Sequence, residues 1–143
     1  MKPNFSILFC DDIRHEIGGK VSLMGIYGTH LLVPSLPIEI SRLVIHFSIE
    51  LPVNMKPNSI KVNILLNGKH HASIELASIG YNEKLAQETL HHRIIGGTDL
   101  NDIEIEEKTN LEASVELDGE FVYNTKLIID TKMHYNEEHA LIE

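Results

Sequence analysis

The residues best suited to chemistry lie close together near the N-terminus, between two apolar segments. The acids and bases of this run are Asp11, Asp12, Arg14, His15, Glu16 and Lys20. Two neighbouring carboxylates could hold a hard cation if they faced the same way. On a β-strand, however, adjacent side chains point to opposite faces. The spacing therefore separates Asp11 from Asp12 and predicts a self-neutralising ladder on one face, made of Asp12, Arg14 and Glu16.

Cys10 is the one cysteine of the chain, so no disulfide can form within it. A nucleophilic cysteine needs a lowered pKa, whereas the negative charges of Asp11 and Asp12 would raise the pKa of this thiol. His15 could serve as a base, but nothing in the sequence fixes its geometry. We expect Cys10 to be a buried apolar residue.

The nine histidines raise the question of a metal site. Two pairs stand out, His70-His71 and His91-His92, but strand alternation sends the members of each pair to opposite faces. No His-Glu-x-x-His, Cys-x-x-Cys, Gly-x-Ser-x-Gly or phosphate-binding glycine motif is present. The sequence therefore predicts no catalytic residue, no metal ligand and no cofactor, and it favours a non-enzymatic protein.

The elements that position these residues follow a period of two. Apolar and polar residues alternate through 43–51, 60–66 and 111–117, which is typical of half-buried strands. Asn67-Gly68 and Asp118-Gly119 follow the second and third of these runs, and both dipeptides favour type I′ hairpin turns.

The remaining segments complete a chain of short strands. We expect strands over 5–13 and 20–28, joined through Gly18-Gly19, and a short strand over 30–33. Residues 80–97 fit either a short helix or a strand, and we favour a loop over 80–86 followed by a strand that ends at Gly96-Gly97. Residues 131–143 lose the alternation, which predicts a polar tail with at most a helical turn.

About eight short strands with regular turn signals predict an all-β protein, an antiparallel β-sandwich, with a closed barrel as the alternative. Tryptophan is absent and only one cysteine is present, so any likeness to immunoglobulin domains is architectural only. The length of 143 residues fits one domain over 1–130 with the tail over 131–143.

Charge narrows the range of partners. Residues 1–98 carry nine Lys and Arg against eight Asp and Glu, whereas residues 99–143 carry three against thirteen. The net charge of −9 has the wrong sign for nucleic acid and disfavours an anionic membrane surface. No signal peptide and no apolar stretch near 20 residues is visible, so we expect a cytoplasmic protein.

The N-terminal run resembles a known signature. Cys10-Asp11-Asp12-Ile13-Arg14-His15-Glu16, followed by Gly19-Lys20-Val21-Ser22-Leu23-Met24-Gly25-Ile26-Tyr27, is similar to the start of a family of short bacterial and phage proteins of unknown function. The resemblance implies no activity. It implies one structural or binding unit made of Asp11, Asp12, Arg14, Glu16, Lys20 and Tyr27.

Three hypotheses follow for the function. The sequence favours a protein-interaction or assembly module, related to phage or prophage, that binds another protein or itself. The alternative is a metal- or small-ligand-binding module that uses the 11–16 region with histidines. A small hydrolase or transferase with an assembled site is the third, and it requires a concave pocket where titratable groups converge.

Overall fold

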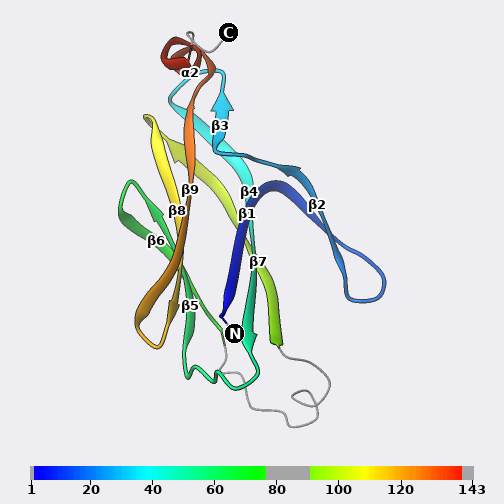
Figure 1. Ribbon diagram of the computed structural model, residues 1–143. Coiled ribbons are helices and arrows are strands. Elements are labelled where there is room, and N and C mark those ends of the chain that lie inside the picture. Colours follow the sequence, from blue (N-terminus) through cyan, green and yellow to red (C-terminus); the bar gives the residue numbers. More distant parts are fainter. Residues whose placement is uncertain (1, 77–90, 140–143) are drawn as a thin grey trace.

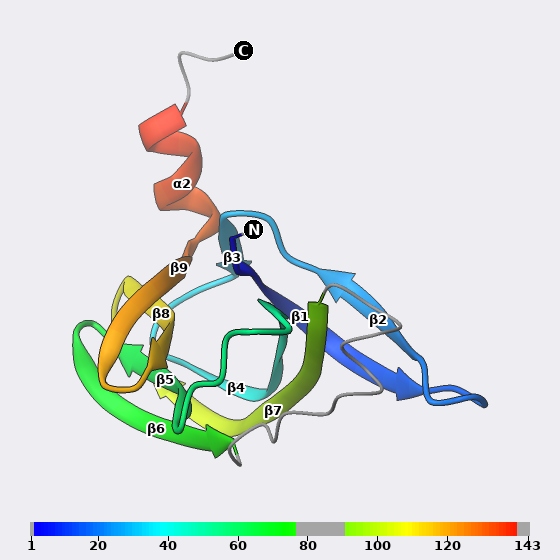
Figure 2. The same cartoon turned by 60° about the horizontal axis from the view of Figure 1, so that its bottom comes forward.

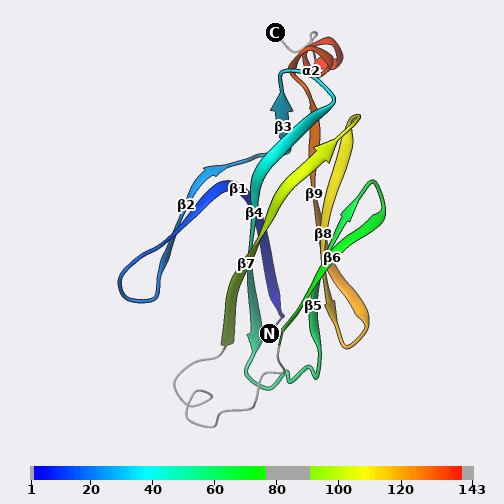
Figure 3. The same ribbon diagram turned by 180° about the vertical axis from the view of Figure 1, so that it is seen from behind.

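The structure is a computed structural model that describes residues 2–76 and 91–139. Within these ranges nine strands form two sheets, which pack face to face (Figures 1 and 3). The four-stranded sheet has the order β2 (Val21–Ile26), β1 (Asn4–His15), β4 (Ile38–Pro52), β7 (His91–Ile105). The five-stranded sheet has the order β3 (His30–Val33), β9 (Glu120–Thr131), β8 (Thr109–Leu117), β5 (Ile60–Leu66), β6 (Lys69–Leu76). The predicted all-β sandwich is confirmed, and the barrel alternative is wrong.

The hydrophobic core lies between the two sheets, and alternation accounts for it. On β4 the predicted inward residues are all buried: Leu43, Ile45, Phe47, Ile49 and Leu51. β5 and β8 contribute their own alternate residues from the opposite sheet: Ile60, Val62, Ile64, Leu111, Ala113 and Val115. Burying each of the larger of these side chains contributes about 1.5–3 kcal/mol, so the alternation of apolar and polar residues stabilises the sandwich.

Both predicted hairpin turns are present. The central residues of each turn have positive φ angles, 49° and 80° for Asn67 and Gly68, and 49° and 84° for Asp118 and Gly119. These are the angles that a type I′ turn requires. The turns join β5 to β6 and β8 to β9 in antiparallel pairs.

Two details of the expected chain path need correction. β3 pairs with β9 in parallel, so the sandwich is not purely antiparallel. β7 does not end at Gly96-Gly97 but continues through it to Ile105, because both glycines pair with β4. The loop expected over 80–86 lies outside the described residues.

The polar segment after β9 contains a helix rather than a single helical turn. Helix α2 (Lys132–His139) begins after Thr131, whose Oγ1 accepts a hydrogen bond from the His134 N–H at 3.1 Å. A threonine in this place satisfies one of the unpaired N–H groups at the helix start. In the part of the chain that the structure describes, no helix has the length and apolar character needed to cross a membrane.

Candidate functional site

The charged N-terminal run forms a β-hairpin that stands away from the sandwich. β1 pairs with β4 over Asn4–Cys10 and with β2 over Cys10–His15, so the strand changes its main neighbour at Cys10. We call residues 11–26 the hairpin arm; it points away from the body of the molecule (Figure 2). All six residues of the expected unit lie on this arm or at its base.

Asp11 and Tyr27 join at the base of the arm. The Tyr27 hydroxyl donates a hydrogen bond to Asp11 Oδ1. Gly25 makes room for this carboxylate, because a Cβ atom at Gly25 would lie 2.3 Å from Asp11 Oδ2. Burial, followed by the hydrogen bond and the charge of Asp11, raises the pKa of Tyr27 to about 12. The hydrogen bond between these two residues therefore stabilises the pairing of β2 with β1.

Asp12 points to the other face and meets residues far away in sequence. It forms an ion pair with Arg42 of β4, and Arg42 Nη2 lies 3.1 Å from Asp99 Oδ2 of β7. Asp12 Oδ1 also accepts a hydrogen bond from the Ile13 N–H at 2.9 Å. The three side chains are between 39% and 46% exposed. The ion-pair chain ties three strands together but contributes modestly to stability, because water screens it.

The predicted ladder of Asp12, Arg14 and Glu16 is wrong. Asp12 pairs with Arg42, and within the described residues Arg14, Glu16 and Lys20 form no ion pair. They lie toward the tip of the arm, where the Glu16 N–H donates to the Lys20 carbonyl at 2.8 Å. The expected unit therefore divides into a bonded base, with Asp11, Asp12 and Tyr27, and a charged tip.

A cleft of about 490 Å³ lies between the arm and β4 and β7. Its polar side chains are His15 and Lys20 from the arm and His46 from β4, and Gly96 and Gly97 contribute to its wall. His46 is only 8% exposed, and burial lowers its pKa, so the imidazole is neutral at pH 7. Its Nε2 atom is buried and has no hydrogen-bond partner among the described residues.

Cys10 is completely buried, as expected. Its Sγ atom lies 3.6 Å from the Asp12 carbonyl oxygen, to which the thiol donates. Burial raises the pKa of Cys10, and the charges of Asp11 and Asp12 add to that effect. A thiol in this state is not a nucleophile at neutral pH.

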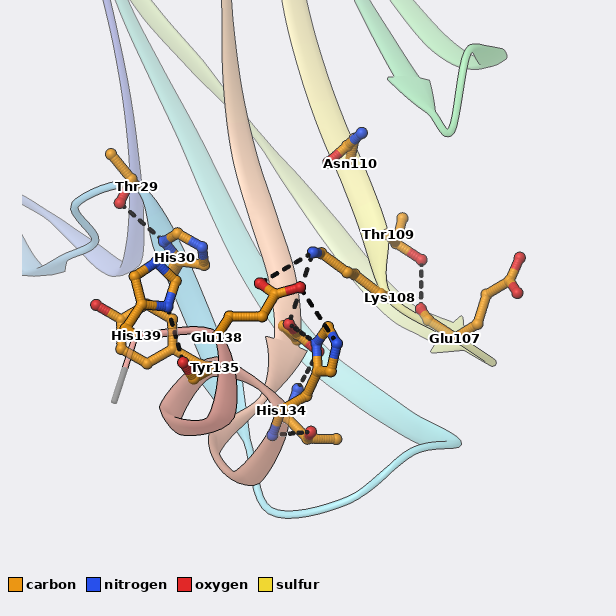
Figure 4. A network of polar contacts seen from close by, with 12 residues as sticks. Thr29, His30, Glu107, Lys108, Thr109, Asn110, His134, Tyr135, Glu138 and His139 are labelled. Atoms are coloured by element: carbon orange, nitrogen blue, oxygen red, sulfur yellow. Dashed lines mark hydrogen bonds and ion pairs between the residues drawn. The ribbon is translucent and has the colours of Figure 1, made fainter. Parts of the chain in front are cut away.

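A second polar cluster lies at the end of the sandwich where α2 meets β9 (Figure 4). His134 Nδ1 lies 2.6 Å from Asp130 Oδ2, and His134 Nε2 lies 3.3 Å from Glu138 Oε1. Lys108 Nζ approaches both carboxylates, at 3.9 Å from Asp130 and 3.6 Å from Glu138. We call these four residues the helix latch. The positively charged Lys108 ammonium group lies beside both carboxylates, where it would repel a metal cation. The geometry therefore favours an ion-pair network.

The sequence alone does not predict some of these contacts, for physical reasons. Arg42 and Asp99 are ordinary polar residues of two different strands, and no local pattern links them to Asp12. The helix latch had a signal, because Asp130, His134 and Glu138 follow the four-residue spacing of one helix face. Because the sequence predicts a polar tail for this segment, it does not predict that the three side chains share one helix face.

The fold and the site define the class of protein: an all-β sandwich that carries a hairpin arm. Within that class, the chain belongs to a family of unknown function, DUF6941, whose profile matches residues 6–130. None of the curated proteins matches the sequence. The match runs from within β1 to within β9 and ends before α2. The expected membership in a family of unknown function is confirmed.

Proposed function

We propose that this protein is a non-enzymatic interaction module that binds an extended strand along the free edge of β2, and that the strand is β2 of a second copy. The observation that carries the proposal is the composition of this edge. β2 reads Val-Ser-Leu-Met-Gly-Ile, with neither a charge nor a proline. Exposed edge strands normally carry charged residues or prolines, because these residues prevent their unpaired N–H and C=O groups from pairing with another strand.

The other sheet edges are protected in ways that β2 is not. β6 carries Lys69 and Glu75, β7 carries several charges, and β3 is only four residues long. Gly25 interrupts the regular backbone of β2 with a φ of 67°, so the pairing surface is residues 21–24. Ile17 at the arm tip is 96% exposed, which adds apolar surface beside this edge.

Charge along the arm also favours a second copy. The tip is net positive through Arg14 and Lys20, whereas the base is net negative because Asp11, Asp12 and Asp99 outnumber Arg42. Antiparallel pairing of two β2 strands places the tip of each arm beside the base of the other. The two-fold axis then repeats each favourable contact.

An interface of four residues per strand is small. Interfaces that bury less than about 1,200 Å² are typical of weak and transient association. We therefore expect a concentration-dependent dimer with a dissociation constant of about 10–100 µM rather than an obligate one. Such a module suits reversible assembly. A cytoplasmic location and a bacterial or phage origin belong to the same proposal.

Sedimentation velocity between about 5 µM and 500 µM tests the proposal, because this range spans the expected constant. The sedimentation coefficient of the unmodified protein should rise with concentration. Ser22→Glu places a charge in the middle of the paired edge, opposite the apolar Leu23 of the second copy, whereas within one arm it faces Arg14, its cross-strand partner. This variant should remain monomeric at all concentrations while its melting temperature stays close to that of the unmodified protein.

Ser35→Glu is the matched control, because Ser35 is an exposed serine in the connection between β3 and β4. It should dimerise like the unmodified protein. Hydrogen exchange adds a local measurement: amides of residues 21–24 should exchange more slowly at high concentration. A strict monomer at the highest concentration, or a dimer that Ser22→Glu leaves intact, rules out the β2 interface.

A second candidate function rests on the cleft under the arm. Its lining combines Lys20, His15 and His46 with apolar side chains, and within the described residues no carboxylate borders it and His46 Nε2 has no hydrogen-bond partner. A volume of about 490 Å³ lies within the usual range for small-molecule sites. This chemistry fits a small anion with an apolar body. In this version of the ligand-binding alternative, His15 and Lys20 would contact the ligand, rather than Asp11 and Asp12.

Phenyl phosphate is a suitable probe for the cleft, because it joins an anionic head to an apolar ring. Amide shifts in a nuclear magnetic resonance titration should appear at residues that border the cleft, and Lys20→Gln should weaken binding about tenfold, the loss of one charge-assisted contact. Lys132→Gln on exposed α2 is the control and should bind normally. Shifts elsewhere, or none, exclude this candidate.

A further inference from the structure

The outer face of the five-stranded sheet carries a row of small hydrogen-bonding side chains. The strand register places Ser73 beside Asn63, Asn63 beside Ser114, and Ser114 beside Asn124. Directly paired residues share a face, so these four side chains form one line across β6, β5, β8 and β9. We call them the polar row. Nothing in the packing of the core requires a polar line here, since the core lies on the other face.

Hydrogen bonds hold most of the row in place. The Ser73 hydroxyl donates to Asn63 Oδ1 at 2.8 Å, and Asn63 Nδ2 donates to Glu116 Oε2 at 3.2 Å. On the far side, Asn124 Nδ2 donates to Glu112 Oε1 at 3.2 Å. Such a network fixes the side chains in advance, which lowers the entropy that binding would otherwise lose.

The centre of the row is left unsatisfied. Ser114 is 3% exposed, and its Oγ atom is buried without a hydrogen-bond partner among the described residues. A buried hydroxyl without a partner costs about 1–3 kcal/mol. Within the described part of the chain, the second carboxylate oxygens of Glu112 and Glu116 accept no hydrogen bond, because the bonds described above use only one oxygen of each.

A cavity of about 590 Å³ lies over this row. Ser114, Asn63 and both glutamates line it, and Phe121 and Val122 supply an apolar border. Phe121 is 68% exposed, which is unusual for a phenylalanine and leaves its ring available to a ligand. The site therefore offers hydroxyl-binding acceptors on one side and an aromatic surface on the other.

We propose that this cavity binds a neutral saccharide. Sugar hydroxyls can donate to the free carboxylate oxygens and to Ser114, while the C–H face of the ring packs on Phe121. The two carboxylates disfavour an anion. Lys61 and Lys126 are the cross-strand neighbours of Glu116 and Glu112 and balance their charge, so a cation gains little. A purely apolar ligand would leave the buried Ser114 hydroxyl without a partner.

Titration with cellotetraose, chitotetraose, xylotetraose and maltotetraose, followed by amide chemical shifts, tests the proposal. At least one tetrasaccharide should cause saturable shifts in residues 112–116 and 121–124, with a dissociation constant of about 1 mM or tighter. Spermidine serves as the cationic comparison and should cause none there. No saturable shift with any of the four sugars, or stronger binding of spermidine, overturns the assignment.

Two variants separate binding from folding. Phe121→Ala should weaken the sugar at least about tenfold, as loss of an aromatic anchor does, while Met133→Ala, an equally exposed apolar residue on α2, should not. Ser114→Ala removes a hydroxyl that has no partner, so it should leave the melting temperature unchanged or raise it, and should still weaken binding. If Ser114→Ala leaves the affinity intact, the polar row is not the site.

Discussion

At the residue scale, the adjacent Asp11 and Asp12 make different contacts, because successive side chains of a strand point to opposite faces. Asp11 accepts from Tyr27 and fastens the two strands of the arm, whereas Asp12 reaches Arg42 and, through it, Asp99. The buried Cys10 beside them contributes packing and no reactivity. The signature run is therefore explained by how the arm is attached, and its charges that form no ion pair with another described residue lie at the tip.

Asp12→Ala tests whether the base of the arm is structural. It removes the ion pair with Arg42 and the hydrogen bond from the Ile13 N–H. Because the pair is partly exposed, we expect the melting temperature to fall by only about 2–4 °C. Thermal unfolding and sedimentation velocity should be measured together on this variant.

Asp12→Asn is the control, because it keeps an acceptor for the Ile13 N–H and should recover part of the loss. An unchanged melting temperature combined with weaker self-association would show that Asp12 acts in recognition instead.

At the element scale, the hairpin turns fix the register of the five-stranded sheet. Asp118 of the β8–β9 turn also accepts hydrogen bonds from the N–H groups of Asn58 and Ser59, at 2.8 and 2.9 Å. This turn thereby holds the segment that leads into β5. In the four-stranded sheet only β1 and β2 are consecutive strands, whereas the β1–β4 and β4–β7 pairings join strands that are distant in sequence.

Gly119→Val should destabilise the protein by about 1–3 kcal/mol, because the position has a φ of 84° that β-branched residues avoid. Chemical denaturation measures the change. Glu120→Val is the control, since it adds the same side chain at the next exposed position, in strand β9. Equal stability of the two variants contradicts the turn assignment.

At the scale of the whole molecule, the helix latch attaches α2 to the sandwich. Hydrogen bonding to Asp130, followed by the charges of Asp130 and Glu138, raises the pKa of His134 above its ordinary value. The hydrogen bonds from His134 and Thr131 lower the pKa of Asp130. On its other side the helix packs Tyr135 against His30 and His139, with ring centroids 4.9 and 4.1 Å away.

The attachment of α2 should therefore depend on pH. The contribution of protonated His134 is complete below the unfolded histidine pKa of about 6.5 and is lost as pH rises through the higher folded value. The contribution of ionised Asp130 is present above about 3.9 and is lost as pH falls through the lower folded value. We expect the amides of residues 134–139 to exchange fastest, relative to intrinsic rates, near pH 9 and slowest near pH 5–6.

His134→Gln should remove most of the change between pH 6 and pH 9, because it replaces the group whose pKa the contacts with Asp130 raise. His30→Gln is the comparison, because His30 packs against the aromatic side of the helix. A pH dependence that survives in His134→Gln would assign the effect to another group.

The sequence by itself determined the elements that rest on local rules. Alternation placed Leu43 to Leu51 in the core, two dipeptides placed the type I′ turns, and the spacing of Asp11 and Asp12 required their divergence. These features depend on neighbours one to four residues away, and the chain encodes such relations directly. The all-β sandwich followed from them, but the strand order of its two sheets did not.

Only the tertiary structure decided which distant residues meet. The pairing of Asp12 with Arg42 and Asp99, the parallel contact of β3 with β9, and the line from Ser73 to Asn124 all depend on strand order and register. Those are set by the packing of the whole sandwich, because many strand orders satisfy the same alternating pattern. The candidate binding surfaces arise from that packing, so no single segment of the sequence displays them.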